Sequence, residues 1–169
     1  AYYWPPSGGS GVQRWLNFTK YLPEFGWKPI VYTPEKPDFG LKDESLLKEV
    51  NPAVEVIKKP IWEPYQLHRS LFGSQGSDKN TAGVVSKEKG YWSNWIRGNL
   101  FVPDPKVFWR KPSVKFLTNY LKSNPVDAMI SSGTPHSMHL IALGIKRSFP
   151  NLPWIADFRD PWTELDMLD

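Results

Sequence analysis

The stretch Ser7-Gly8-Gly9-Ser10-Gly11 is the most informative part of the chain, because it joins an aromatic run at residues 1–6 to a helical pattern. Glycine has no Cβ, so the backbone of Gly8, Gly9 and Gly11 can approach a ligand closely. The start of a helix also presents unpaired N–H groups at the positive end of its dipole. The stretch therefore favours a phosphorylated ligand, and the alternative is a plain connection between two elements.

The segment after the glycines predicts a helix followed by a buried strand. Side chains that are apolar except for one threonine recur at steps of three and four up to a stop signal at Gly26, namely Val12, Trp15, Leu16, Thr19, Leu22 and Phe25. The β-branched run at 29–33, closed by Pro34, predicts a strand of a parallel sheet. These elements make half of a βαβ unit. Its first strand is either a short one within residues 1–4 or lies before them, since Pro5 and Pro6 interrupt the chain there.

Two known phosphate-binding motifs do not fit these residues. A P-loop needs Lys-Ser or Lys-Thr after the glycines, and neither pair follows them here. A dinucleotide fingerprint needs a third glycine where Arg14 stands and an acidic residue where Thr33-Pro34 closes the strand. An NAD-binding oxidoreductase half-domain is therefore only an alternative.

Composition indicates one globular α/β domain spanning residues 1–169, because 40% of the residues are apolar. The chain has no cysteine, and none of its three histidines lies in an H-E-x-x-H motif, so we expect no metal site and no cofactor. The formal net charge of +4 is spread along the chain, so we expect no nucleic-acid partner. No apolar run approaches the length of a membrane span.

The remaining segments predict helices and strands in alternation. We expect helices at 43–50, 112–122 and 138–149, and strands at 53–57, 125–131 and 154–158. Two polar loops follow the last two strands, one with His136 and one with Arg159. Ligands of open α/β sheets lie beyond the carboxyl ends of strands, so these loops and the glycine stretch are predicted to converge.

An insertion at about 60–111 holds many of the aromatic residues. Its middle, 73–90, is small and polar and predicts a mobile loop. The flank at 91–111 interleaves aromatic and basic residues, which suits either packing on its own domain or contact with an anionic membrane. We favour packing, because Trp92, Trp95 and Ile96 share one helical face.

Three motifs together carry a family resemblance. They are Tyr-Tyr-Trp-Pro-Pro-Ser-Gly-Gly-Ser-Gly at 2–11, Ser-Ser-Gly-Thr-Pro-His-Ser-Met-His-Leu at 131–140 and Asp-Phe-Arg-Asp-Pro-Trp at 157–162. In this combination the chain resembles the N-terminal half of bacterial glycosyltransferases of the GT-B fold, in the large family-four group. The likeness covers nearly the whole chain, and its polar insertion is similar to that of enzymes of surface-polysaccharide synthesis.

The resemblance implies a Rossmann-like open, mostly parallel sheet flanked by helices, as one half of a GT-B fold. In such enzymes this half holds the acceptor, and a C-terminal domain, absent from this chain, holds most of the nucleotide-sugar. The implied partners are a nucleotide-sugar, a glycan or lipid-linked sugar acceptor and the protein's own C-terminal domain. The implied reaction is metal-independent sugar transfer, with retained configuration and without a protein nucleophile. The fragment alone is expected to be inactive.

The resemblance also implies roles for individual residues. The N–H groups of Gly8, Gly9 and Gly11 would face the donor diphosphate. His136 would contact or polarise the acceptor hydroxyl, and Asp160 would accept a hydrogen bond from a sugar. Ser132, Thr134 and Arg159 would bind the acceptor. Arg159 would either orient Asp160 or pair with a phosphate of the acceptor.

Other interpretations stay open for several of these features. Asp157, Arg159 and Asp160 could form an internal ion-pair arrangement that only holds their loop, and His139 could be plain packing. The whole chain could be a non-catalytic sugar-binding or scaffold domain. For the enzyme we expect a cytoplasmic location, with peripheral contact at the inner face of the plasma membrane as an addition.

Overall fold

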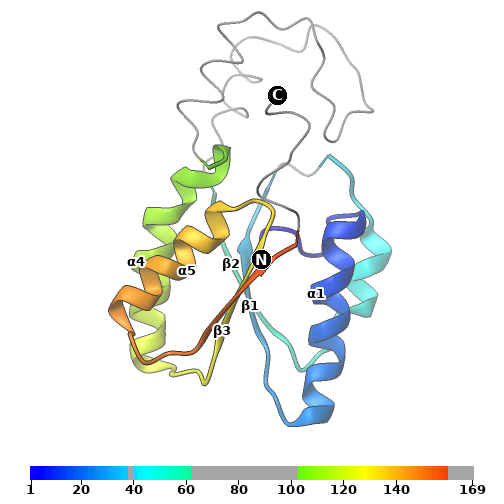
Figure 1. The fold of residues 1–169 in the computed structure, drawn as a ribbon. Helices are drawn as coiled ribbons and strands as arrows, with labels where there is room; N and C mark the ends of the chain where they lie inside the picture. Colours follow the sequence, from blue (N-terminus) through cyan, green and yellow to red (C-terminus); the bar gives the residue numbers. More distant parts are fainter. Residues whose placement is uncertain (38–39, 62–102, 160–169) are drawn as a thin grey trace, which may run out of the picture. The chain divides into compact units, whose positions relative to one another are not determined.

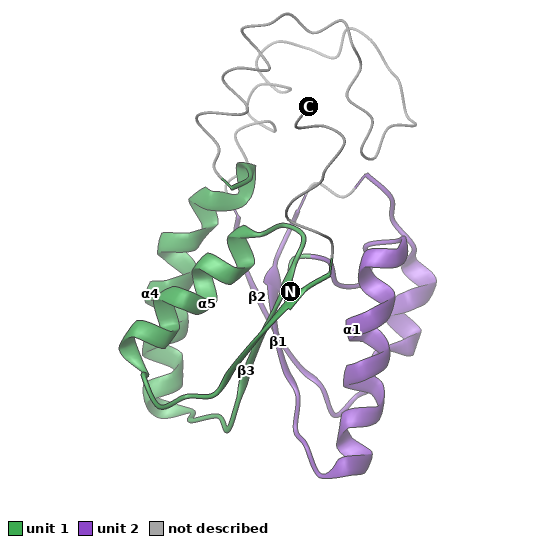
Figure 2. Cartoon of the chain, viewed as in Figure 1, with its two compact units in different colours: residues 1–2, 102–169 green, residues 3–101 purple. Residues whose placement is uncertain are grey.

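The computed structural model describes residues 1–37, 40–61 and 103–159, and their fold is α/β (Figure 1). The chain divides into two compact units (Figure 2). Unit 1 comprises residues 1–2 and 102–169, and unit 2 comprises residues 3–101. Among the described residues, each unit contains one two-stranded parallel sheet.

Unit 2 contains a helix and a parallel strand pair. Its elements are α1 (Ser10–Tyr21), the 3₁₀ helix η1 (Leu22–Phe25), β1 (Ile30–Pro34), the 3₁₀ helix η2 (Glu44–Glu49) and β2 (Glu55–Lys59). In the β1–β2 ladder Ile30 lies opposite Glu55 and Pro34 lies opposite Lys59. Gly26, in the left-handed region at φ 79°, ends η1 as the sequence predicts.

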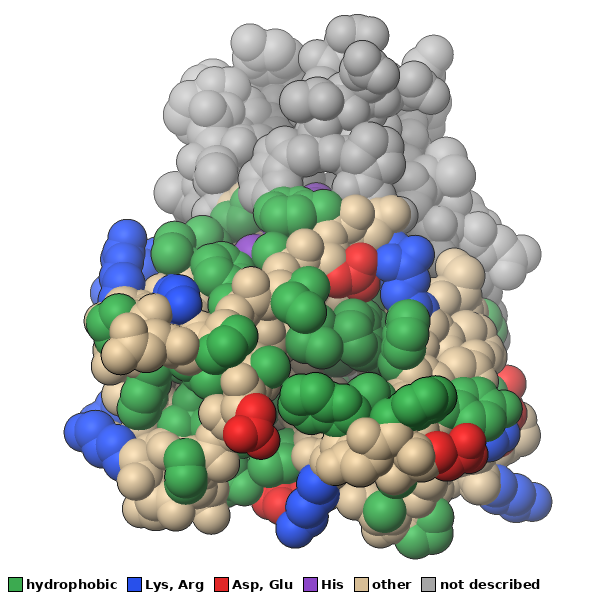
Figure 3. Space-filling model, turned by 60° about the horizontal axis from the view of Figure 1, so that its bottom comes forward, with side chains coloured by type: hydrophobic (Ala, Val, Ile, Leu, Met, Phe, Trp, Pro, Cys, Tyr) green, Lys and Arg blue, Asp and Glu red, His purple; other side chains and the backbone are tan. Residues whose placement is uncertain are grey.

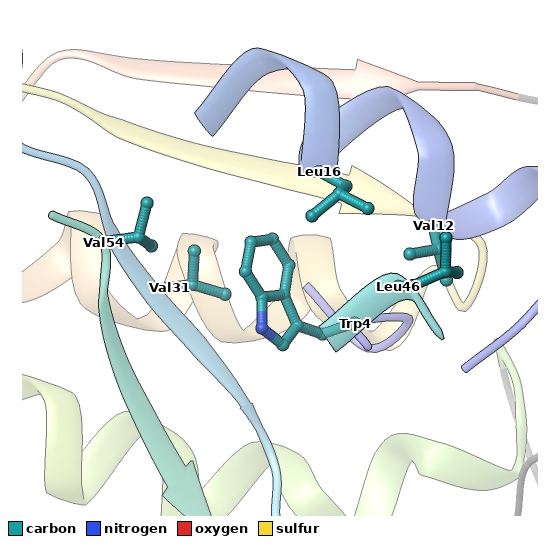
Figure 4. Packing of buried hydrophobic residues seen from close by; sticks show 6 residues of the cluster. All are labelled: Trp4, Val12, Leu16, Val31, Leu46 and Val54. Carbon is teal, nitrogen blue, oxygen red and sulfur yellow. The ribbon is translucent and has the colours of Figure 1, made fainter. Parts of the chain in front are cut away.

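The core of unit 2 is built around the indole of Trp4 (Figure 4). The other buried members come from α1, β1, η2 and the approach to β2, namely Val12, Leu16, Val31, Leu46 and Val54. Residues 1–4 form no strand, so a short strand there, one of the two alternatives, is wrong. Pro5 and Pro6 have no N–H to donate to a ladder, and Trp4 instead is buried as a core residue.

Unit 1 contains a β3–α5–β4 arrangement preceded by two helices. Its elements are the 3₁₀ helix η3 (Pro105–Trp109), α4 (Arg110–Ser123), β3 (Met129–Gly133), α5 (Ser137–Ser148) and β4 (Trp154–Phe158). Strands β3 and β4 are parallel. Helix α5 packs against both strands, and α4 packs against α5 (Figure 1).

A glycine allows the close contact between α4 and α5. A Cβ built on Gly144 of α5 would lie 2.6 Å from Cγ2 of Val114 on α4. A distance this short leaves no room for a methyl group unless Val114 moves. Gly144 is therefore placed in the middle of α5 for packing, although glycine lowers helix propensity.

Most predicted elements are confirmed, with shifted bounds. The helix predicted at 43–50 is the 3₁₀ helix η2, Glu44–Glu49. The strand predicted at 53–57 begins two residues later, because the Asn51 side chain first accepts a hydrogen bond from the Ala53 N–H in a turn. Phe25 was expected to face inward but is 76% exposed, because the α-helix ends at Tyr21. The loop at 73–90 and most of the insertion lie outside the described residues.

Charged side chains are scattered over the face drawn in Figure 3. On that face Lys and Arg lie at several separate places, and Asp and Glu at others, among apolar side chains. Of the helices that the structure describes, none is both long enough and apolar enough to cross a membrane.

Candidate functional site

The glycine turn of unit 2 is tied to the segment at 41–43. The N–H of Gly8 donates to the Leu41 carbonyl at 2.9 Å, and the Asp43 N–H donates to the Pro6 carbonyl at 2.8 Å. The N–H of Gly8 is therefore already hydrogen-bonded within the fold. Because residues 1–4 are not a strand, the turn also does not follow the carboxyl end of a strand among the described residues.

Gly9 and Gly11 stand at the start of α1. Gly9 precedes the helix with φ 86°, a backbone conformation that residues other than glycine adopt only at a cost in free energy. Gly11 lies in the first turn, where amides have no acceptor within the helix. Their role toward a phosphate stays a prediction, and it now rests on these two glycines more than on Gly8.

Three predicted site residues, Ser132, Thr134 and Arg159, lie together with Asp157 at the carboxyl ends of β3 and β4 in unit 1. The Ser132 hydroxyl donates to Oδ2 of Asp157 at 2.8 Å, and Arg159 Nη2 donates to the Thr134 hydroxyl at 3.3 Å. The two strands are parallel and adjacent, so these loops lie side by side. Ser132 and Thr134 thus have partners inside the fold as well as a predicted role in acceptor binding.

His139, which the sequence left as plain packing, belongs to a buried hydrogen-bond chain. Its Nδ1 lies 2.8 Å from the Ser131 hydroxyl oxygen, which also accepts the indole N–H of Trp154 at 2.9 Å. The side chain is only 5% exposed, and its Nε2 has no hydrogen-bond partner among the described residues. The sequence signal was a histidine one helical turn after His136.

Gly133 lets two imidazole rings approach the end of β3. A Cβ at Gly133 would lie 2.8 Å from Nε2 of His139 and 2.9 Å from Nδ1 of His136. The ring of Phe158, at the end of β4, stacks on His139 with 4.2 Å between centroids, and it lies 6.3 Å from His136. We call Gly133, His136, His139 and Phe158 the histidine cluster.

The surroundings of His139 favour its neutral form. Burial lowers the pKa of His139 from the ordinary value of 6.5, and nearby His136 lowers it further, whereas Asp157 opposes the shift. The ring is therefore neutral at neutral pH. A neutral imidazole can donate one hydrogen bond and accept another, which suits it to orienting a polar ligand.

An internal carboxylate occupies the start of α5, just after the histidine cluster. Oδ2 of Asp104 accepts the Ser137 N–H at 2.7 Å, and Oδ1 accepts the Ser137 hydroxyl at 2.9 Å. Oδ1 also accepts the Lys106 N–H at 2.8 Å, at the start of η3. The positive end of α5 is thus already compensated by a negative charge, so this helix start is not set up for a phosphate. Asp104 was not among the predicted residues.

Several expectations fall outside these sites. Asp160 lies outside the described residues, so its sugar contact and its ion pair stay predictions.

From the aromatic flank, Trp109 is buried and Lys106 Nζ lies 4.9 Å from the centroid of the Tyr2 ring, whereas Phe108 is 41% exposed. In the described ranges no three His, Cys, Asp or Glu residues are grouped to hold a metal ion. A pocket lined by Val126, Phe149 and Leu152 lies near the amino ends of β3 and β4, away from the histidine cluster.

Comparison with models of protein families, with curated proteins and with solved structures gives no match to this chain.

Proposed function

We propose that the chain is the acceptor-side, N-terminal domain of a nucleotide-sugar-dependent glycosyltransferase that acts on a glycan or lipid-linked sugar. One observation carries the proposal: Thr134, His136 and Arg159 lie at the carboxyl ends of two adjacent parallel strands. This is the edge at which α/β sheets bind ligands. The same residues stand in the motifs that resemble the GT-B family. The proposal includes a Rossmann-like open sheet, of which a β3–α5–β4 arrangement is a typical unit.

The histidine cluster and its neighbours supply the acceptor side of the proposed reaction. His136 contacts the acceptor hydroxyl and polarises its O–H bond as the new glycosidic bond forms. Arg159, held by the Thr134 hydroxyl, binds a phosphate or a sugar oxygen of the acceptor. Asp160 follows it directly in the chain and accepts a hydrogen bond from a sugar hydroxyl.

The donor side depends on the glycine turn and on a second domain. N–H groups at the start of α1, from Gly9 and Gly11, stabilise negative charge on the diphosphate as it leaves. The proposed C-terminal domain binds the rest of the nucleotide-sugar. The proposed enzyme works in the cytoplasm, where nucleotide-sugars are supplied, with lipid-linked acceptors presented at the inner face of the membrane.

The test is release of nucleotide diphosphate by the full-length parent protein over a panel of nucleotide-sugars, with simple sugar and polyprenyl-linked acceptors. We expect release with one donor, and a loss of about 10²-fold or more in His136→Ala, as for removal of a group that assists proton transfer. Arg147→Ala, at the exposed end of α5, is the matched control and should retain activity. Folded protein that releases nothing and binds no nucleotide would instead favour a sugar-binding or scaffold domain.

A further inference from the structure

The buried chain Trp154–Ser131–His139 has a defined direction. An indole N–H can only donate, so the Ser131 oxygen is the acceptor of the 2.9 Å contact from Trp154. Within the described ranges, the other partner of the Ser131 hydroxyl is Nδ1 of His139, at 2.8 Å. A hydroxyl oxygen can also accept from a protonated Nδ1, but the hydroxyl proton would then have no acceptor in the described ranges, so the arrangement that pairs it directs this proton to Nδ1. In a neutral imidazole that accepts at Nδ1, the ring proton is on Nε2.

The Nε2–H group that results is a buried donor without an acceptor in the described part of the chain. His139 is 95% buried, so bulk water does not supply one freely. Buried donors in native proteins are nearly always paired, and leaving one unpaired costs free energy. An unpaired donor held so firmly indicates a site for an oxygen atom that the protein itself does not provide.

The position of this site follows from Gly133. Nε2 of His139 and Nδ1 of His136 each lie within 3 Å of the point that a Gly133 side chain would occupy. The two ring nitrogens therefore approach the end of β3 from the same side, and the lack of a Cβ at Gly133 allows this close approach.

Local charges favour a neutral oxygen over an anion. Asp157 is close enough to His139 to act on its ionisation, and Arg159 lies at the neighbouring Thr134. One carboxylate and one guanidinium leave no excess positive charge, and the neutral His139 adds none. A hydroxyl group fits these conditions, because it accepts the Nε2–H and keeps its own proton for another partner.

We propose that His139 Nε2–H, beside Gly133, donates a hydrogen bond to a hydroxyl oxygen of a bound sugar. Ser131 and Trp154 are positioning residues, which hold the tautomer through Nδ1. The choice of a sugar rests on the proposed function, whereas the tautomer and the donor do not.

Imidazole nitrogen NMR on the full chain, labelled with ¹⁵N at histidine, tests both parts. In the unliganded protein His139 should show protonated Nε2 and unprotonated Nδ1. Titration with methyl glycosides of common hexoses should move the Nε2–H resonance saturably for at least one of them, and inorganic phosphate should not. A protonated Nδ1, or a Nε2–H that no glycoside moves because water alone fills the space, overturns the proposal.

Variants separate the donor from the positioning residues. Trp154→Phe keeps an aromatic ring but removes the indole donor, so the tautomer preference of His139 should weaken. Gly133→Ala should abolish the glycoside-induced shift. Gly144→Ala is the control, because it adds a methyl group in the same unit but at the contact with Val114, so the shift should remain. If Gly133→Ala does not fold, His139→Gln replaces it and should lower glycoside affinity in a competition titration. A glycoside-dependent shift without nucleotide diphosphate release would keep this inference and refute the enzyme, so the two failures are distinguishable.

Discussion

The carboxylate of Asp104 closes the start of α5 by accepting hydrogen bonds from both the N–H and the hydroxyl of Ser137, 33 residues further along the chain. Ser137 is fully buried, so water does not compete for these bonds. The contact joins the segment before η3 to the loop that carries His136. The histidine cluster is therefore held from outside its own strand and helix.

Replacing Asp104 should measure how much this contact stabilises unit 1. We expect Asp104→Ala to lower the free energy of unfolding by about 1–2 kcal/mol, as for loss of a helix N-cap. Urea denaturation followed by far-UV circular dichroism gives the value. Asp127→Ala removes an exposed carboxylate before β3 and is the matched control. Equal stability of the two variants would contradict a capping role for Asp104.

The close approach of α4 and α5 should make Gly144 intolerant of a methyl group. Gly144→Ala gains roughly 1 kcal/mol in helix propensity but overpacks Val114, which costs about 1–3 kcal/mol. We expect a net loss of stability, which Val114→Ala in the same chain relieves. A double-mutant cycle on chemical denaturation measures this coupling. A single Gly144→Ala variant more stable than the parent would refute the packing argument.

Thr118 presents a different kind of defect on α4. Its hydroxyl is buried and has no hydrogen-bond partner among the described residues. Thr118→Val keeps the shape and removes the unpaired group, so thermal unfolding should show a gain of roughly 1 kcal/mol. Thr19→Val is the control, because the Thr19 hydroxyl donates to the Trp15 carbonyl at 2.8 Å, and it should not be stabilising. A loss of stability in Thr118→Val would mean that this hydroxyl has a partner after all.

The lowered pKa of His139 predicts a pH dependence of folding. Because the native state disfavours the charged ring, the unfolded chain binds the proton first as the pH falls below about 6.5. The contribution of His139 to stability is therefore complete above that pH and declines below it, toward the folded-state pKa. Unfolding free energies measured from about pH 7.5 to about pH 5, a range that includes the usual His titration, give the slope of stability against pH.

A variant isolates this effect from the other titrating groups. His139→Gln should be less stable at every pH but should show a shallower decline below pH 6.5 than the parent. An unchanged slope in the variant would show that other groups cause the pH dependence.

Local pattern was enough to predict most helices and strands. The bounds predicted for β4 agree with the structure, and Val12, Leu16 and Thr19 form the buried face of α1 as their spacing indicates. These predictions succeed because helical and strand periodicity depends on neighbours in sequence. At residues 1–4 a short strand was one of two alternatives, because a βαβ unit needs a strand before the glycine stretch, but these residues form no strand and Trp4 is buried in the core.

The candidate site was predicted in part. The loops of His136 and Arg159 were found from their place after strands, and the pairing of β3 with β4 brings Thr134 and Arg159 into contact. Asp104 and Trp154 were not found, because their hydrogen-bond partners lie 33 and 23 residues away, and the contact of Ser131 with His139, eight residues apart, depends on how β3 and α5 pack.

Composition and periodicity along the chain were sufficient to predict the α/β class, the main elements and which loops carry polar side chains. The folded structure was needed to show that the Gly8 amide is hydrogen-bonded within the fold, that Asp104 accepts hydrogen bonds at the start of α5, and that Trp154, Ser131 and His139 form one hydrogen-bond chain. The physical reason is that hydrogen bonds depend on distance and direction in space. Residues far apart in sequence meet these conditions only after packing has placed them.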